Sequence, residues 1–428
     1  MSLPDAVLRS TPPTGGLYMP CSLPVIPAPF FMNFGEMSFD EIAYVIANQL
    51  FGNDIPAATL KHIVDDAFNF PVPLVQVSEN TYAIELFHGP TLAFKDFGAR
   101  FMARLLSHLH MGRNGKGQSS KLNVLVATNG NTGSAVANGF AGISGVEVYV
   151  LFPRGHAGRQ LESQFTTLGG NIHALEVQGS IDDCHSIVAQ AFADEALNAV
   201  AALTSANSVN IVRLLPQTFY YFYAMAALRA RLPHNARVTV AIPSGNLGNL
   251  TAAVTARRMG LAIDRIIACE NANGFLTSML HTLSMPDTPR AIPTLACGAD
   301  KGRPSNIERL LHLCGGSALG IANELEAYSF SDAEIISAVN TCYDRNNYTI
   351  DPHTALAWQG LEQHLAPGET GLMVATGHPA KSLTAMSAIT GRAMDLPLQL
   401  TRFMAGSDLR KKIPPVYPAL RDIILRNL

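Results

Sequence analysis

The sequence contains few charged residues and no large excess of either sign. Of its 428 residues only 15% are charged, the formal net charge is −3, and the pI is about 6.5. This balance provides no basic field for a nucleic-acid backbone or an anionic membrane, so we expect neither partner. The hydrophobic fraction of 48% excludes a mainly disordered chain and predicts a large buried core.

Cysteine is scarce and unpaired in the sequence. Six cysteines stand at positions 21, 184, 269, 297, 314 and 342, without a CxxC pair, and the thirteen histidines show no metal-ligand spacing. In a chain of this length the scatter indicates reduced core thiols, which excludes a disulfide framework and a metal site. A signal peptide and an uninterrupted apolar span are also missing, so we expect a cytoplasmic protein.

Three common enzyme signatures are absent as well. The chain contains no GxGxxG fingerprint, no GK[ST] sequence and no GxSxG elbow. Dinucleotide-binding and P-loop folds therefore lose their main support, and so does an α/β-hydrolase.

The patterns that are present predict two regions. Residues 1–80 are predicted to form a small helical domain, in which Ser38 and Glu41 make a capping box that opens a helix. In residues 81–428, β-rich runs alternate with helical stretches, which predicts an α/β body with parallel sheets. The predicted strands are Leu122–Ala127, Val146–Phe152, Ile172–Val177, Val238–Ile242 and Gly371–Ala375. Between 270 and 330 only Ile307–Leu313 is predicted as a helix.

Two of these strands lead into glycine-rich loops followed by a helix. Thr128–Gly133 follows one strand and Ser244–Asn249 follows another. A helix start offers unpaired N–H groups, and glycine lets a phosphate or carboxylate approach the backbone closely. Each loop alone could simply turn the chain, but two loops rich in hydroxyl and amide groups favour anion binding.

A lysine in an aromatic stretch is the third candidate feature. Lys95 stands among Phe87, Phe94 and Phe97 in the run ELFHGPTLAFKDFG, and Phe101 follows just after it. The alternatives are a solvated surface lysine or one whose pKa is lowered by apolar surroundings, which would make it a candidate covalent nucleophile. Thr376 follows the last predicted strand, where it could meet a ligand or simply cap a turn.

A lysine with two anion-binding loops suggests pyridoxal phosphate, and at this point the sequence resembles the threonine synthase family, pyridoxal-phosphate enzymes of fold type II. The resemblance rests on the segments Glu85–Gly98, Thr128–Gly133, Leu168–Ile172, Asn207–Asn210, Ser244–Asn249 and His378–Lys381. It implies two open twisted parallel-sheet lobes, the smaller and mobile one at roughly 122–225, and the larger one formed by the rest of 81–428.

The resemblance also implies roles for individual residues. Lys95 would join the cofactor covalently and move protons, and Thr376 would face the pyridine nitrogen. Ser244, Gly245, Asn246, Leu247, Gly248 and Asn249 would hold the cofactor phosphate. The substrate carboxylate would be held by Asn129, Asn131 and Thr132, with Asn131 also near the cofactor ring, and the substrate phosphate by Asn207, Ser208 and Arg213.

The reaction that the resemblance implies converts O-phospho-L-homoserine and water to L-threonine and phosphate, catalysed by a monomer or homodimer. Asn129, His156 and Gly274 depart from the pattern usual in the family. The first two favour an alternative, a phospho-lyase that releases 2-oxobutyrate, ammonia and phosphate. A non-catalytic metabolite-binding protein is a third alternative, against which the retention of Lys95 argues.

Overall fold

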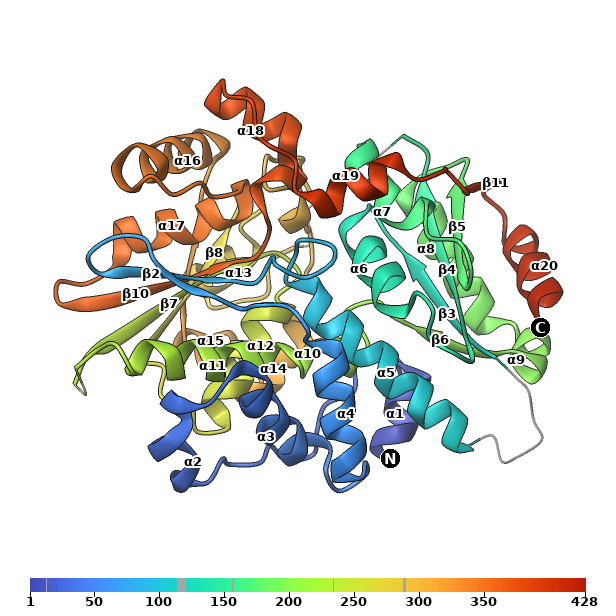
Figure 1. The fold of residues 1–428 in the computed structure, drawn as a ribbon, viewed down its shortest axis with the longest axis horizontal. Coiled ribbons are helices and arrows are strands. Elements are labelled where there is room, and N and C mark those ends of the chain that lie inside the picture. The colour runs from blue at the N-terminus through green and yellow to red at the C-terminus, as the bar shows by residue number, and fades with distance from the viewer. Residues whose placement is uncertain (13, 114–120, 156–157, 234, 288–289) are drawn as a thin grey trace.

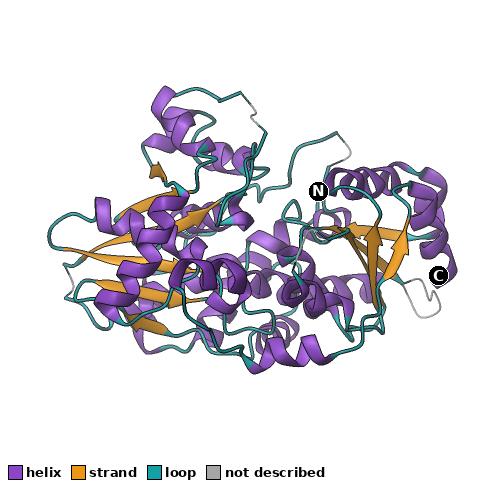
Figure 2. Cartoon of the chain, turned by 90° about the horizontal axis from the view of Figure 1, so that it is seen from above, coloured by secondary structure: helices purple, strands orange, loops and turns teal. Residues whose placement is uncertain are grey.

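Two β-sheets lie side by side in the computed structural model, the larger one on the left in Figure 1 and the smaller one on the right. The structure describes residues 1–12, 14–113, 121–155, 158–233, 235–287 and 290–428. Nearly all strand pairs are parallel, and helices connect the strands, as Figure 2 shows from above. The prediction of an α/β fold with two parallel-sheet lobes and a helical N-terminus is confirmed.

The larger sheet has six strands in the order β1-β2-β10-β7-β8-β9. They are β1 (Leu74–Gln76), β2 (Thr81–Glu85), β7 (Arg237–Ser244), β8 (Arg265–Glu270), β9 (Glu326–Ser329) and β10 (Glu369–Ala375). Only β1 runs antiparallel to its neighbour. Met373 pairs with Ala241, so Thr376 and Ser244 each stand three residues beyond that pair, at the same edge of the sheet.

The smaller sheet has five parallel strands in the order β11-β5-β4-β3-β6. They are β3 (Leu122–Ala127), β4 (Val146–Pro153), β5 (Ile172–Val177), β6 (Ala202–Ser205) and β11 (Lys411–Ile413). β3, β4 and β5 are almost entirely buried, which explains their continuous apolar sequences. The predicted strands are confirmed here, with shifts of a few residues at some ends.

Helices at the N-terminus pack beneath both sheets in Figure 1. They are α1 (Leu3–Arg9), α2 (Ala28–Asn33), η1 (Phe34–Glu36), α3 (Phe39–Phe51) and α4 (Ala57–Ala67). The predicted capping box opens α3, where the Ser38 backbone N–H donates to the Glu41 carboxylate at 2.8 Å. Their buried apolar side chains belong to the same core cluster as residues of both sheets, so this region is packed onto the body.

The remaining helices cover the two sheets. Around the smaller sheet lie α6 (Asn131–Phe140), α7 (Arg159–Thr166), α8 (Ile181–Ala193), α9 (Glu195–Val200) and α20 (Tyr417–Asn427), with α19 (Leu398–Ala405) beside α7. Around the larger sheet lie α10 (Ile211–Leu214), α11 (Gln217–Arg229), α12 (Gly248–Arg258), α13 (Phe275–Thr282), η2 (Cys297–Ala299), α14 (Ile307–Leu313), α15 (Ala318–Ala322), α16 (Asp332–Asn346), α17 (Pro352–His364), η3 (Pro379–Ser382) and α18 (Leu383–Thr390). The long helix α5 (Lys95–Arg113) passes between the two sheets (Figure 1).

The end of the chain returns to the smaller sheet. β11 pairs with β5, and α20 packs beside α8, whereas the sequence placed residues after 225 in the larger lobe. A strand of three residues, two of them lysines, has no visible alternation, so its pairing could not be read from its sequence. The domain boundaries as a whole stay a prediction.

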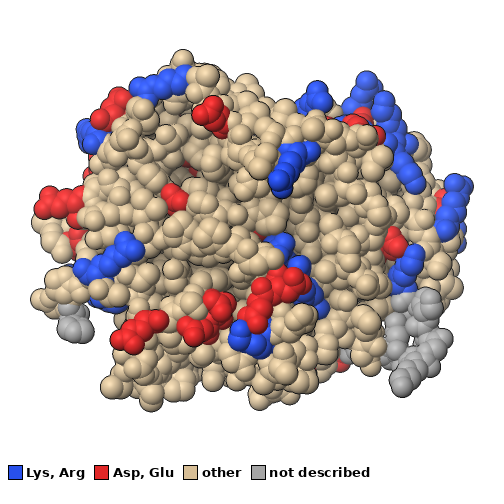
Figure 3. Space-filling view, in the orientation of Figure 1, with Lys and Arg blue, Asp and Glu red and all other residues tan. Residues whose placement is uncertain are grey.

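The surface agrees with the sparse charge of the sequence. On the face shown in Figure 3, basic and acidic side chains are interspersed and separated by wide uncharged areas. In the described part of the chain, no helix is both long enough and apolar enough to span a membrane.

The C-terminal helix should contribute measurably to stability. Leu420 is fully buried against the smaller sheet, whereas Leu425 on the same helix α20 is exposed. We expect Leu420→Ala to lower the free energy of unfolding by about 2–5 kcal/mol, because it leaves a cavity. Urea denaturation measures this, with Leu425→Ala as the matched control, which should stay near wild type. Equal losses in the two variants would show that α20 is not anchored through Leu420.

Candidate active site

The turn before Lys95 is tied to the end of strand β10. The Phe94 N–H donates to the Thr376 carbonyl at 3.0 Å, and the His378 N–H donates to the Leu92 carbonyl at 3.1 Å. Leu92 has a φ of +56°, a left-handed conformation that costs a leucine free energy and persists only where its surroundings impose it. The backbone thus brings Lys95 and Thr376, almost three hundred residues apart in the sequence, to one place.

The buried Asp96 and the half-buried Lys381 hold the same turn. The Asp96 carboxylate accepts hydrogen bonds from the Thr91 N–H at 2.9 Å and from the Thr91 hydroxyl at 2.6 Å. The Lys381 ammonium donates to the Thr91 carbonyl at 2.5 Å. Burial lowers the pKa of Lys381 to about 7, despite the opposing effect of Asp96. Sequence analysis quoted Lys381 only as part of a matching segment and assigned it no role.

Lys95 itself is a titratable amine in a poorly solvated place. Its side chain is half-buried at the start of α5, and its Nζ lies 5.2 Å from the centre of the Phe94 ring. Burial, together with the positive charges of Arg213 and Lys301, lowers the pKa of the Lys95 ammonium to about 8. An amine with such a pKa has a substantial neutral fraction near pH 7, which a nucleophile and a proton carrier both require.

The loop Ser244–Asn249 has the conformation of an anion cradle. It connects β7 to α12, and Leu247 in its middle has a φ of +59°. A Cβ atom on Gly245 would lie 2.5 Å from the Cα of Ala299, so only glycine fits there. The backbone strain and the close approach indicate a functional constraint on the loop, at the start of a helix.

Asn249 leaves one donor of this loop without a protein partner. Its Oδ1 accepts hydrogen bonds from the hydroxyls of Tyr220 at 2.6 Å and Tyr221 at 2.7 Å. The two hydroxyls fix the orientation of the amide, and its Nδ2 is buried without a hydrogen-bond partner in the described part of the chain. A buried N–H without a partner is costly, so it points to an acceptor supplied by a ligand.

The loop Thr128–Gly133 forms the corresponding edge of the smaller sheet. The Thr128 hydroxyl accepts from the N–H groups of Gly130 and Gly133, each at 2.9 Å, which closes the loop tightly before α6. Asn131 is half-buried, and its Oδ1 lacks a hydrogen-bond partner among the described residues. Thr132 is also half-buried, while Asn129 is exposed at the tip of the loop. The loop therefore presents polar side-chain atoms, such as the Asn131 Oδ1, that have no hydrogen-bond partner among the described residues and could bind a ligand.

The segment Asn207–Arg213 adds a buried positive charge. Arg213 is 5% exposed, and its Nη1 donates to the Ala206 carbonyl at 2.8 Å, but its Nε has no partner among the described residues. Burial lowers the pKa of Arg213 to about 10. Asn207 likewise has a buried Oδ1 without a partner, and the Ser208 hydroxyl accepts from the Asn246 amide at 2.7 Å. This last bond joins the segment to the loop Ser244–Asn249.

Three further polar groups lie near the site, one of which, His353, the sequence already placed there, as a ligand contact or an ordinary hydrogen-bonded histidine. His353 donates from Nδ1 to the Asp351 carboxylate at 2.7 Å and accepts at Nε2 from the Gly298 N–H at 3.0 Å. Arg309 donates to the Ser208 and Val209 carbonyls, and Asn306 donates to the Asn246 carbonyl; neither residue was given a role from the sequence. Asn306 and Arg309 lie at the start of α14, which the sequence predicts as a helix, but their contacts with distant segments leave no signal in the sequence. His156, the other departure noted in the sequence, lies outside the described residues.

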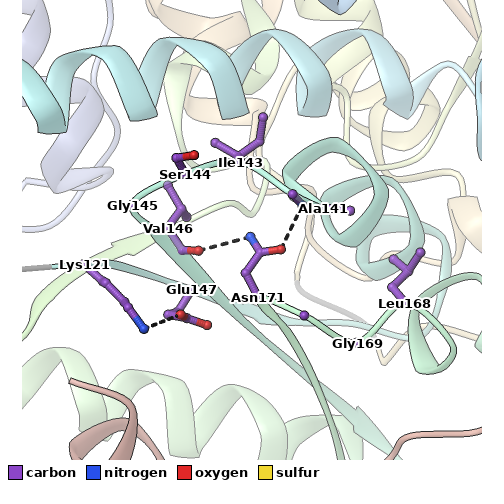
Figure 4. Close-up of a pocket in the computed structure, with 12 residues that line it drawn as sticks. Lys121, Ala141, Ile143, Ser144, Gly145, Val146, Glu147, Leu168, Gly169 and Asn171 are labelled. Atoms are coloured by element: carbon purple, nitrogen blue, oxygen red, sulfur yellow. Dashed lines mark hydrogen bonds and ion pairs between the residues drawn. The ribbon is translucent and has the colours of Figure 1, made fainter.

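A recess of about 370 Å³ lies elsewhere, at the smaller sheet (Figure 4). Polar side chains that line it already have partners within the protein: Asn171 donates to the Val146 carbonyl at 3.1 Å, and Lys121 pairs with Glu147 at 2.8 Å. It opens at the amino ends of β3, β4 and β5, whereas Lys95 and both loops gather at carboxyl ends. Because ligands of open α/β sheets bind at carboxyl ends, this recess is separate from the site.

Fold and site together define a pyridoxal-phosphate-dependent enzyme. The family described as "Pyridoxal-phosphate dependent enzyme" matches residues 71–377, and the one described as "Threonine synthase N terminus" matches residues 1–68. Threonine synthase from Escherichia coli strain K12 is 37% identical over all of this chain and 97% of its own length. The chain belongs to the threonine synthase family.

Two further comparisons extend over most of the chain. Threonine synthase from Haemophilus influenzae is 38% identical over 92% of this chain and 89% of its own length. The crystal structure of threonine synthase with bound pyridoxal phosphate from Brucella melitensis superposes with a TM-score of 0.92 at 28% identity, covering all of this chain and 96% of that one. These matches confirm the predicted family and cofactor and favour a threonine synthase over the phospho-lyase alternative.

The residues present fit this cofactor. A phosphate at the loop Ser244–Asn249 would supply the acceptor that the Asn249 Nδ2 lacks, and Gly245 leaves the backbone free for close approach. Lys95 supplies an amine whose pKa suits a bond to an aldehyde. The individual assignments to cofactor and substrate stay predictions.

The titration of Lys95 can be measured directly in the cofactor-free protein. We expect acylation of Lys95 to reach half of its maximal rate at pH about 8, because only the neutral amine reacts. Peptide mass spectrometry after brief labelling at a series of pH values gives the profile. Urea-unfolded protein is the control, in which the midpoint should move towards the ordinary lysine value near 10.4. Coinciding profiles of folded and unfolded protein would contradict the lowered pKa.

Proposed function

We propose that this chain converts O-phospho-L-homoserine and water to L-threonine and phosphate. The observation that carries the proposal is the pair of anion cradles beside Lys95. One is the loop Ser244–Asn249 with its unpaired Asn249 amide, and the other holds the buried Arg213 with its unpaired Nε. The substrate and the cofactor each carry a phosphate group, so two cradles match two phosphates.

In the first cradle, the backbone N–H groups of residues 245–249 and the Asn249 amide would bind the cofactor phosphate. The Thr376 hydroxyl, buried at the end of β10, would face the pyridine nitrogen as a neutral partner. Asn131 would lie near the ring hydroxyl. When bound, pyridoxal phosphate withdraws electrons from the substrate and so makes its Cα and Cβ protons acidic.

Lys95 would move the protons of the reaction. It would take the proton from Cα, and a Cβ proton would follow as phosphate leaves from Cγ. Water would then add at Cβ, and protons would return to Cγ and Cα. A pKa near 8 suits both directions, because the group exchanges protons readily at neutral pH. Burial, assisted by the positive charge of Arg213, keeps that pKa low and so keeps part of the amine neutral.

The other side chains would orient the substrate. Asn129, Asn131 and Thr132 would bind its carboxylate at the start of α6. Asn207, Ser208 and Arg213 would bind its phosphate, and a guanidinium suits a phosphate because two of its N–H groups can donate in parallel. A substrate held at both ends keeps its Cα near Lys95.

Two further predictions concern the oligomeric state of the protein and its location in the cell. A monomer or homodimer would catalyse the reaction. The cytoplasm is the proposed location, in keeping with the six cysteines, which are all free in the structure.

The products distinguish this reaction from that of a phospho-lyase. Holoenzyme incubated with O-phospho-L-homoserine should release phosphate and form L-threonine in equal amounts, because water adds before the product leaves. Phosphate assay and amino-acid chromatography of the same sample measure both. Lys95→Ala is the control and should form neither product. 2-Oxobutyrate and ammonia in place of threonine would make the chain a lyase.

Arg213 should matter mainly for binding the phosphate end of the substrate. We expect Arg213→Ala to raise the KM for O-phospho-L-homoserine by roughly 10- to 100-fold, since it removes charged hydrogen bonds. The visible absorption of the bound cofactor should be unchanged. Binding of L-homoserine, which lacks the phosphate, serves as the control and should be equal in both proteins. Loss of the cofactor from the variant would refute this placement of Arg213.

A further inference from the structure

Arg309 is among the largest fully buried side chains of the molecule. It lies on α14 and is only 1% exposed. Its guanidinium donates to three backbone carbonyls, those of Tyr18 at 3.2 Å, Ser208 at 3.0 Å and Val209 at 2.6 Å, and to the side-chain oxygen of Asn306 at 2.8 Å. One side chain thus reaches the N-terminal region, the substrate segment and its own helix cap.

The charge of Arg309 is not neutralised by these contacts. All four hydrogen bonds end on uncharged oxygen atoms, and burial lowers the pKa of Arg309 to about 10. Burying an ion away from water costs free energy unless a counter-charge compensates for it. A core position would be served more cheaply by an apolar residue, so this arginine indicates a function that needs its charge and its geometry.

The hydrogen bonds around Arg309 connect the two proposed anion cradles in a closed circuit. Asn306, which accepts from Arg309, donates from Nδ2 to the Asn246 carbonyl at 2.9 Å. The Asn246 amide donates to the Ser208 hydroxyl at 2.7 Å and to that of Ser305 at 2.8 Å, and its Oδ1 accepts from the Ser305 N–H at 2.7 Å. Arg309 then closes the circuit at the Ser208 carbonyl.

The position of these contacts explains why the circuit matters. Ser208 and Val209 belong to the segment proposed for the substrate phosphate, and Asn246 belongs to the loop proposed for the cofactor phosphate. Carbonyl groups bound by Arg309 are turned towards the arginine, so they are kept from pointing at a bound phosphate. The backbone of both cradles is therefore set by one buried cation.

We propose that Arg309 is a positioning residue that holds the cofactor-phosphate loop and the substrate-phosphate segment in register with each other. The proposal rests on the proposed function for the identity of the second cradle. Arg309 touches neither phosphate; it acts through the Ser208 and Val209 carbonyls and through Asn306. Its charge adds a favourable field for both anions, because no acid shares its hydrogen bonds.

The test compares two affinities in the holoenzyme. Calorimetry measures the binding of inorganic phosphate, a probe for the substrate cradle, and gel filtration followed by absorbance measures the rate of cofactor loss. We expect Arg309→Met to weaken phosphate binding by about tenfold or more and to speed cofactor loss by a similar factor, because bonds to a charged group are removed. Arg309→Lys keeps the charge but not the planar set of N–H donors, so it should retain only part of the phosphate affinity and of the cofactor retention.

Arg100 offers a matched control. It is also buried, 8% exposed, and donates to the carbonyls of Ala67 and Asp66 at the packing of α5 on α4, away from the two loops. Arg100→Met should lower the melting temperature and leave both affinities unchanged. A change in only one affinity in Arg309→Met, or in neither, or equal changes in Arg100→Met, would overturn the proposal.

The outcome is separable from that of the proposed function. If the holoenzyme makes no threonine, the proposed reaction fails, yet a joint loss of phosphate and cofactor affinity in Arg309→Met would still establish the coupling. If threonine forms but Arg309→Met keeps both affinities, the reaction stands and the role of Arg309 is refuted.

Discussion

Burial of positive charge around the carboxyl ends of the sheets is the constraint on which the site depends. The pKa values of Lys95, Arg213 and Arg309 are all lowered, in each case chiefly by burial. Neighbouring carboxylates do not offset the free energy that it costs to remove these cations from water. A bound anion would offset part of that cost, so anion binding is favoured. The site is thus built for ligands with phosphate groups, and the amine of Lys95 becomes reactive for the same reason.

The two sheets supply the rigidity that such an arrangement needs. Parallel strands put their carboxyl ends at one edge, so Ser244 and Thr376 are neighbours by register alone. The strained turn around Leu92 is then pinned to β10 by backbone hydrogen bonds and to Lys381 through Thr91. Leu92 and Leu247, which both have a positive φ, flank the proposed ligand. Backbone strain of this kind is typically found at functional sites.

Prediction from the sequence succeeded where a residue type and its neighbours carry the signal locally. Strand–loop–helix patterns located the loops Thr128–Gly133 and Ser244–Asn249. For Lys95 the sequence left two alternatives, a solvated lysine or one with a lowered pKa, and the structure supports the second. It failed for β11, whose three residues carry no pattern, and for Arg309, because an arginine on a predicted helix is normally a solvated residue.

The sequence by itself therefore determined the α/β class, the helical N-terminus and the family, because periodicity and short motifs are local properties of the chain. Only the tertiary structure decided which polar atoms are left without partners and which cations lose their water. Both depend on contacts between segments such as Ser208 and Arg309, about a hundred residues apart, which the folding of the two sheets brings together. Burial is a property of the whole packed molecule, and so is the chemistry that it produces.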